Sequence, residues 1–165
     1  MTGFRSASLI VSWLTLASSI LTCTAEEEVG KDDLQKATVP QARVVDWWFA
    51  RHAEKIGEMS KGEVELLMVG DSITHNFESE DHGRTVWEKY FAPMKAVNLG
   101  FGGDRTNHVL WRLEYLPKTK APPKAAVVLI GTNNIGWGSD TPRQAAEGVK
   151  AVAAKLHALW PEMKV

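Results

Sequence analysis

Apolar residues in this chain follow two spacings that alternate along its length. They recur every three or four residues, as in amphipathic helices, over residues 41–60, 108–116 and 141–160. Between these stretches lie unbroken apolar runs of strand length, at residues 66–69, 96–99 and 125–130. One further short helix is predicted at residues 85–90. Helices and strands thus alternate, which predicts an α/β fold with a parallel sheet covered by helices on both faces.

The first predicted helix carries an apolar stripe and a charged face. The stripe consists of Val44, Trp48 and Ile56, with Val45, Trp47 and Met59 at its margins. The residues expected to face water are Arg51, Glu54, Lys55 and Glu58. Adjacent tryptophans more often pack a helix on a sheet than form a platform for a ligand, so we predict packing for both. Lys61-Gly62 is expected to end this helix.

The last predicted helix has clear signals at both ends. Thr141 is expected to cap it, with Pro142 in its first position and Gln144 completing a capping box. The inward stripe is predicted to be Ala145, Val149, Val152, Leu156 and Leu159. His157 lies beside this stripe and is predicted to be a surface residue. Pro161 ends the helix, and residues 163–165 resemble the start of a fourth strand.

Each predicted strand runs into a polar or glycine-rich sequence. The three sequences are Gly70-Asp71-Ser72, Gly100-Phe101-Gly102-Gly103-Asp104 and Gly131-Thr132-Asn133-Asn134. In parallel α/β sheets, ligands bind beyond the carboxyl ends of the strands. We therefore expect these segments to meet at one edge of the sheet.

Together, these segments could supply acyl-transfer chemistry. Such a reaction needs a nucleophile, a base that takes its proton, and donors that stabilise the oxyanion. Ser72 could supply the hydroxyl, and the backbone amides of Ser72 and Gly103 could act as donors with the side-chain amide of Asn133. Gly-Asp-Ser alone is weak evidence, because it is also an ordinary turn with a helix cap.

Other classes of function fit the sequence less well. The glycine-rich loop lacks the third glycine of a dinucleotide fingerprint, because that position is Arg105. No two histidines have metal-ligand spacing on a helix, so no metal is expected. With 19 basic and 20 acidic residues, the chain has no charge excess for nucleic acid. We expect a small-molecule ester as the partner, and no stable membrane insertion after cleavage of an N-terminal signal.

The first 25 residues resemble a secretory signal peptide. Arg5 precedes an apolar stretch from Ala7 to Leu21, small residues follow, and three glutamates come next. We predict a signal at residues 1–25, a linker at 26–40 and secretion or periplasmic export. An uncleaved anchor and a lipoprotein signal at Cys23 remain alternatives. Cys23 is the only cysteine, so no disulfide is expected after cleavage.

The three strand-end segments together resemble the first three sequence blocks of the SGNH (GDSL) hydrolases. Residues 98–114 further resemble the branch that contains the platelet-activating-factor acetylhydrolase α-subunits. The resemblance implies a three-layer α/β/α sandwich, flavodoxin-like, over residues 41–165, and no cofactor. It also implies that Ser72 is the nucleophile, and that Ser72, Gly103 and Asn133 form the oxyanion hole.

One departure from this family concerns the general base. The family's last block, Asp-x-x-His, is absent, and no aspartate stands three residues before any of the five histidines. His75 follows Ser72 by one turn but is expected to project along its own helix. We therefore expect a fragment cut before its base, inactive as these 165 residues alone.

Two functions remain open on the sequence. The first is an exported serine esterase that cleaves an ester, expected to be acetyl, of a carbohydrate or a short-chain lipid. The second is a binding module of the same fold that holds an acylated sugar or lipid without cleaving it.

Overall fold

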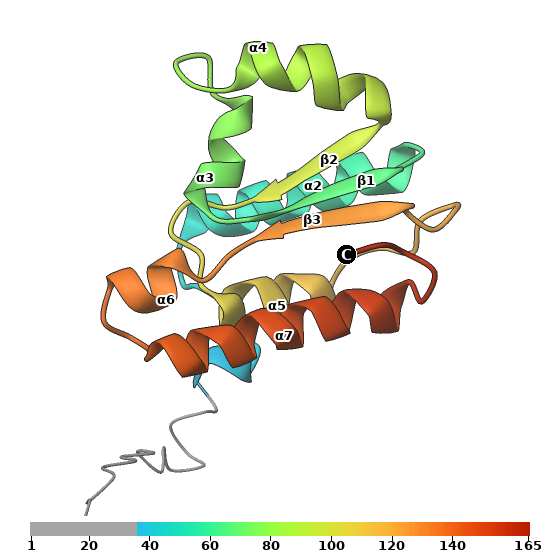
Figure 1. Ribbon diagram of the computed structural model, residues 1–165. Coiled ribbons are helices and arrows are strands. Elements are labelled where there is room, and N and C mark those ends of the chain that lie inside the picture. The colour runs from blue at the N-terminus through green and yellow to red at the C-terminus, as the bar shows by residue number, and fades with distance from the viewer. Residues whose placement is uncertain (1–35) are drawn as a thin grey trace, which may run out of the picture.

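The computed structural model describes residues 36–165, with a parallel three-stranded sheet at their centre (Figure 1). β1 (Leu66–Gly70) lies between β2 (Ala96–Gly100) and β3 (Ala125–Leu129). All three predicted strands are confirmed. Lys164 forms a further parallel bridge to Ala125, and its carbonyl accepts the Ala126 amide at 2.7 Å. The expected strand character near residue 164 is confirmed by this pairing.

Helical segments precede and connect the strands. They are α2 (Asp46–Lys61), α3 (Ser72–His75), η1 (Asn76–Glu78), α4 (Arg84–Val86), η2 (Trp87–Phe91), η3 (Ala92–Met94), α5 (Thr106–Glu114), α6 (Thr132–Gly136) and α7 (Pro142–Leu159). The predicted alternation of helices and strands is confirmed. The capping box of Thr141 and Gln144 at the start of α7 is also confirmed.

The main core lies between the sheet and the pair α5 and α7, which run side by side (Figure 1). Alternate strand residues point into it, because side chains alternate between the faces of a strand. Its buried members include Leu67, Val69, Val97, Leu99, Val109, Leu113, Val152 and Leu156. The predicted stripe of α7 is thus largely correct. Leu159 is exposed, however, and His157 lies on the surface as expected.

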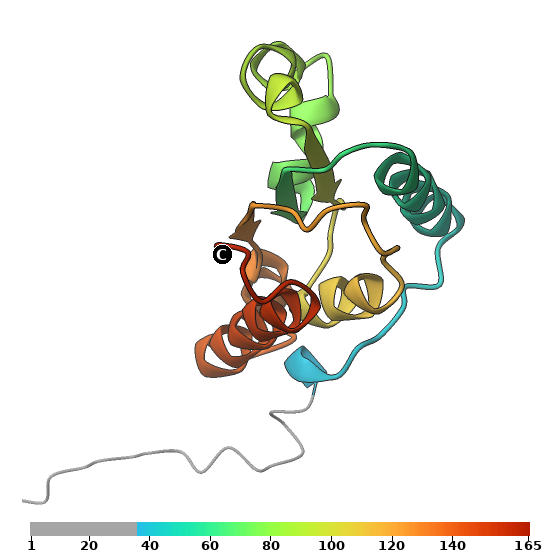
Figure 2. The same cartoon turned by 90° about the vertical axis from the view of Figure 1, so that its right-hand side faces the viewer.

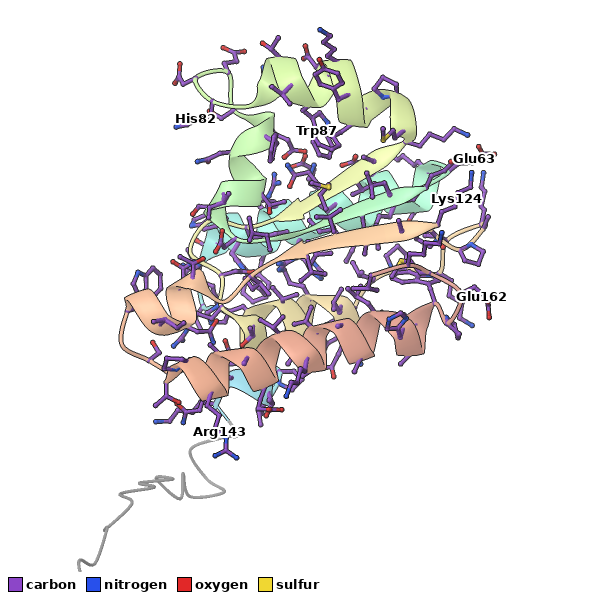
Figure 3. The ribbon with its side chains drawn as sticks, viewed as in Figure 1. Glu63, His82, Trp87, Lys124, Arg143 and Glu162 are labelled. Carbon is purple, nitrogen blue, oxygen red and sulfur yellow. The ribbon has the colours of Figure 1, made fainter. Side chains whose placement is uncertain are left out.

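The opposite face of the sheet is covered unevenly. α3 contacts β1 and β2, and α2 contacts β2. Residues 84–94 project from the rest of the molecule (Figure 2), and Trp87 points from this segment toward the sheet (Figure 3). On β3 the alternate residues Val127 and Leu129 are 50% and 48% exposed. The predicted covering of both faces therefore holds for β1 and β2 but not for β3 within residues 36–165.

The first helix differs from its prediction in start and in orientation. α2 begins at Asp46, so Val44 precedes the helix and is exposed. Arg51 and Lys55 are buried rather than facing water, because both pair with Glu78. Trp48 is buried against its neighbours as predicted, whereas the packing prediction is wrong for Trp47, which is 43% exposed.

The predicted signal peptide and most of the predicted linker lie outside the described residues. The described end of the linker contacts the domain, since Ala37 is buried and its carbonyl accepts the Thr106 hydroxyl at 2.8 Å. Within residues 36–165, no helix combines the length and apolar character needed to cross a membrane.

Candidate active site

The three strand ends meet at one edge of the sheet, as predicted. Gly70 pairs in register with Gly100 on one side and with Leu129 on the other. Asn133 then links the three turns. Its Nδ2 donates to the Asp104 carbonyl at 2.9 Å and lies 3.5 Å from Asp71 Oδ2. Asn133 thereby contacts the residues that adjoin Ser72 and Gly103 in the chain.

Ser72 is the first residue of α3, directly beyond β1. Asp71 caps this short helix by accepting the Ile73 amide at 2.9 Å. The Ser72 side chain is half-buried, and its hydroxyl makes no hydrogen bond to another residue in the described part of the chain. A serine at this turn with an uncommitted hydroxyl is available to a substrate.

Two glycines allow α3 to lie directly on the strand ends. A Cβ at Gly70 would come within 2.2 Å of Thr74 Oγ1, and one at Gly100 within 2.3 Å of the backbone nitrogen of His75. Asn98 fastens the helix by donating from Nδ2 to the Thr74 carbonyl at 2.8 Å. The glycines of the strand ends thus fix the position of the serine helix.

Gly103 requires glycine for both its conformation and its surroundings. Its φ of 75° lies in the left-handed region, which residues that carry a Cβ atom rarely adopt. A Cβ there would lie 3.0 Å from Trp137 Cη2 and 3.3 Å from Arg43 Nη1. Gly103 therefore has no side chain of its own that could screen its backbone amide.

Asp104 anchors the loop that carries Gly103. Its fully buried carboxylate accepts hydrogen bonds from Trp48 Nε1 and Arg112 Nε, each at 2.8 Å. Arg112 also donates to the Leu99 carbonyl at 3.2 Å, and its guanidinium lies 3.8 Å from the Phe101 ring centre. Burial raises the pKa of Asp104 although the Arg112 charge opposes that shift.

The buried pair of Asp104 and Arg112 was not expected from the sequence. The available signal was Arg112 itself, which falls next to Leu113 on the inward side of the predicted helix. A charged residue on a buried helix face calls for a buried partner of opposite charge.

No described histidine is placed as the base for Ser72. His75 instead turns toward the glycine-rich loop, and its Nδ1 accepts the Gly102 amide at 3.2 Å. Burial and the nearby Arg51 charge lower the pKa of His75, which favours the neutral ring that this bond requires. Within residues 36–165 the general base therefore has no assigned residue.

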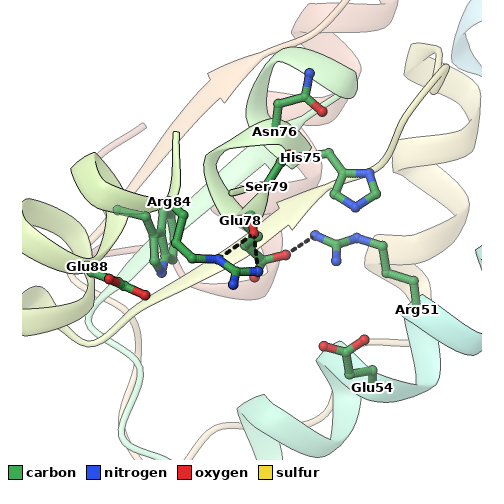
Figure 4. A pocket seen from close by; sticks show the side chains of 9 residues that line it. Arg51, Glu54, His75, Asn76, Glu78, Ser79, Arg84 and Glu88 are labelled. Carbon is green, nitrogen blue, oxygen red and sulfur yellow. Dashed lines mark hydrogen bonds and ion pairs between the residues drawn. The ribbon is translucent and has the colours of Figure 1, made fainter. Parts of the chain in front are cut away.

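A separate cavity of about 510 Å³ lies between α2 and the η1–α4 region (Figure 4). Arg51 donates to Glu78 Oε2 at 2.7 Å and to the Gly100 carbonyl at 2.9 Å, and Lys55 donates to Glu78 Oε1 at 2.6 Å. Burial alone would raise the pKa of Glu78, but Lys55 and Arg51 together lower it. The lining of this cavity includes His75 but not Ser72, Gly103 or Asn133.

Behind the glycine-rich loop, His52 is buried among aromatic rings. Its ring lies 5.5 Å from that of Trp111 and 6.1 Å from that of Trp48. Neither ring nitrogen has a hydrogen-bond partner among the described residues. Burial, assisted by the Arg112 charge, lowers the pKa of His52 to about 4.

We expect this histidine to make the fold sensitive to acid. The pKa of His52 is lowered from 6.5 to about 4 in the folded protein. Above pH 6.5 the ring is neutral in both states and the fold keeps its full stability. As the pH falls from 6.5 toward 4, the unfolded chain binds the proton more readily, so the free energy of unfolding falls. His52 alone should lower the free energy of unfolding by about 2 kcal/mol between pH 7 and pH 5. Urea titrations at both pH values measure this difference.

His52→Phe should remove that part of the pH dependence, because phenylalanine fits the aromatic surroundings and carries no proton. His108 would still contribute in the same direction, since burial and the charge of Arg105 lower its pKa to about 3. His157→Gln is the matched control, because that side chain is exposed on α7. An unchanged pH difference in His52→Phe would contradict the assignment.

The family model and the curated relatives that match this chain indicate the same family. Residues 68–165 match the model of the GDSL-like lipase/acylhydrolase family. Platelet-activating factor acetylhydrolase IB subunit alpha1 of Rattus norvegicus is 36% identical over 118 residues, which cover 72% of this chain and 48% of that protein. Subunit alpha2 of Gallus gallus is 33% identical over 137 residues, covering 81% and 57%.

These curated relatives are longer proteins, of whose length the chain spans about half. A solved structure from Streptococcus pneumonia, whose description names a platelet activating factor, is similar at 22% identity and a TM-score of 0.53. The similarity covers 71% of this chain and 53% of that one. At this identity it supports the fold alone.

Proposed function

Because the chain belongs to the GDSL-like lipase/acylhydrolase family, we propose that it cleaves a small carboxylic ester through an acyl-serine intermediate on Ser72. One observation carries the proposal. The Asn133 amide contacts both the Asp104 carbonyl and the Asp71 carboxylate, and these residues adjoin Gly103 and Ser72 in the chain, which supports a shared site for the three residues.

In the proposed first step, Ser72 Oγ attacks the ester carbonyl carbon. The carbonyl oxygen becomes an oxyanion, which the amides of Ser72 and Gly103 and the side chain of Asn133 stabilise. The serine proton passes to a base and then to the departing alcohol. In the second step, water attacks the acyl-serine, which releases the carboxylic acid and restores the hydroxyl.

The proposed substrate is an acetyl ester of a carbohydrate or of a short-chain lipid. The names of the curated relatives support an acetyl group, because they are acetylhydrolase subunits. Export remains part of the proposal, and the apolar stretch between Ala7 and Leu21 supports it. Binding without cleavage is the competing function.

Asn133→Ala should slow formation of the acyl-enzyme by roughly a hundredfold or more, with little change in the apparent affinity for substrate. A donor that acts on the oxyanion stabilises the transition state and not the bound ester, so the rate falls and the affinity stays. The measurement is the release of p-nitrophenolate from p-nitrophenyl acetate over a range of substrate concentrations.

Asn76→Ala is the matched control, because Asn76 lines the separate cavity and not this site. A weakened affinity at an unchanged rate would instead assign Asn133 to ground-state binding. That result would favour the module that binds without cleaving.

A further inference from the structure

Two exposed tryptophans flank the loop that carries Gly103. Among the tryptophans that the structure describes, only Trp47 and Trp137 are exposed, at 43% and 60%. An indole is the largest apolar side chain, so leaving it in water forgoes burial that the fold could have used. Exposed aromatic groups gathered at a proposed reaction site indicate contact with a ligand.

Trp137 lies close to Gly103 and follows Asn133 by one helical turn. It follows α6, and its amide donates to the Asn133 carbonyl at 3.4 Å, one helical turn earlier. Residues four apart on a helix lie on the same face, so Trp137 and Asn133 are neighbours on one side of α6. Its Cη2 is also 3.0 Å from the point where a Cβ of Gly103 would lie.

Arg43 and Trp47 continue this surface, and the Trp47 ring also stacks on the His75 ring, with the ring centres 6.2 Å apart. Arg43 Nη1 donates to the Gly102 carbonyl at 2.6 Å, and its guanidinium carbon lies 5.5 Å from the Trp47 ring centre. The Arg43 side chain is only 19% exposed, so its position is fixed by these contacts. We call Arg43, Trp47 and Trp137 the indole wall.

We propose that the indole wall is the subsite for the alcohol part of the ester, and that this alcohol is a sugar ring. The inference rests on the proposed function, because it places the alcohol beside the donors for the oxyanion. The C–H face of a pyranose is apolar and flat, and it can stack on the indole of Trp137, since Arg43 and His75 already pack against the Trp47 ring. Its hydroxyl groups can accept hydrogen bonds from a guanidinium, which has donors and no acceptor.

The charges at the wall disfavour a choline-bearing lipid. A quaternary ammonium group binds in an aromatic cage because the ring faces attract cations. Here the Arg43 cation already lies over Trp47. The carboxylates of Asp71, next to Ser72, and of Asp104, in the loop itself, are buried and cannot face a ligand cation. A fatty chain is also disfavoured, because Arg43 interrupts the apolar surface.

Calorimetric titration of the purified protein tests this subsite without requiring turnover. The probes are an acetylated xylo-oligosaccharide and acetylcholine, which share the acetyl ester and differ in the alcohol. We expect measurable binding of the acetylated saccharide and none of acetylcholine at the same concentrations. Trp137→Ala should weaken saccharide binding at least tenfold, and Trp137→Phe should weaken it less because an aromatic face remains.

Tyr90→Ala is the matched control, since Tyr90 is an exposed aromatic residue on the projecting η2 segment. It should leave saccharide binding unchanged. Equal or tighter binding of acetylcholine, or unaltered saccharide binding in Trp137→Ala, would overturn the proposal. Saccharide binding at the wall without acetylation of Ser72 by p-nitrophenyl acetate would support the subsite and refute the proposed function.

Discussion

Ser72→Ala should reduce acetylation of the protein by p-nitrophenyl acetate to the uncatalysed level. Both steps need a base, which takes a proton from Ser72 in the first and from water in the second. Nitrophenolate leaves readily in the first step, whereas the second must expel the much poorer serine alkoxide, and residues 36–165 place no histidine to help it. We therefore expect acetyl-Ser72 to accumulate in the unaltered protein. Peptide mass spectrometry after a timed incubation should find it on the peptide that contains Ser72.

The alanine variant should keep its fold, because the Ser72 hydroxyl makes no hydrogen bond to another described residue. An unchanged thermal unfolding midpoint checks this. Ser79→Ala is the matched control, since Ser79 lines the separate cavity, and it should be acetylated as fast as the unaltered protein. If Ser72→Ala retains more than a tenth of the acetylation, Ser72 is not the nucleophile.

The sheet and the meeting of its strand ends at one edge could be predicted because local pattern determines them. Three apolar runs of strand length, each followed by glycine and polar residues, are sufficient to indicate parallel strands whose ends share one edge. Ser72 and Gly103 follow from that geometry. Both positions depend on short-range requirements, a strand-to-helix turn and a left-handed backbone, which residue types reveal.

The orientation of α2 could not be predicted from its own sequence. Apolar spacing placed Arg51 and Lys55 in water, yet both are buried beside Glu78. Burial of a cation depends on whether a distant carboxylate meets it, and helical periodicity contains no information on that partner. For the same reason, the sequence does not reveal that Trp137 approaches Arg43 and Gly103, which lie far from it in the chain.

Asp104→Leu should be among the most destabilising single changes in this protein. The substitution removes the acceptor for Arg112 Nε and Trp48 Nε1 and leaves the Arg112 charge in the interior. Breaking a buried ion pair on one side costs about 3–5 kcal/mol, because the remaining charge is neither paired nor hydrated. That is a large part of the roughly 5–15 kcal/mol that stabilises a typical domain. Urea unfolding at pH 7 measures the loss.

A second substitution distinguishes an unpaired charge from a simple loss of packing. The unpaired Arg112 guanidinium is the expected cause of the instability. Arg112→Met in the Asp104→Leu background should then restore at least half of the lost free energy of unfolding, because an apolar pair can replace a buried ion pair. Glu147→Gln, which removes an exposed pair with Lys150, should change the stability by less than about 0.5 kcal/mol. A double variant as unstable as the sum of both single variants would show that Asp104 acts mainly through Trp48 and the shape of the loop. In that case the loop, rather than the charge pair, would hold Gly103 and the carbonyl that positions Asn133.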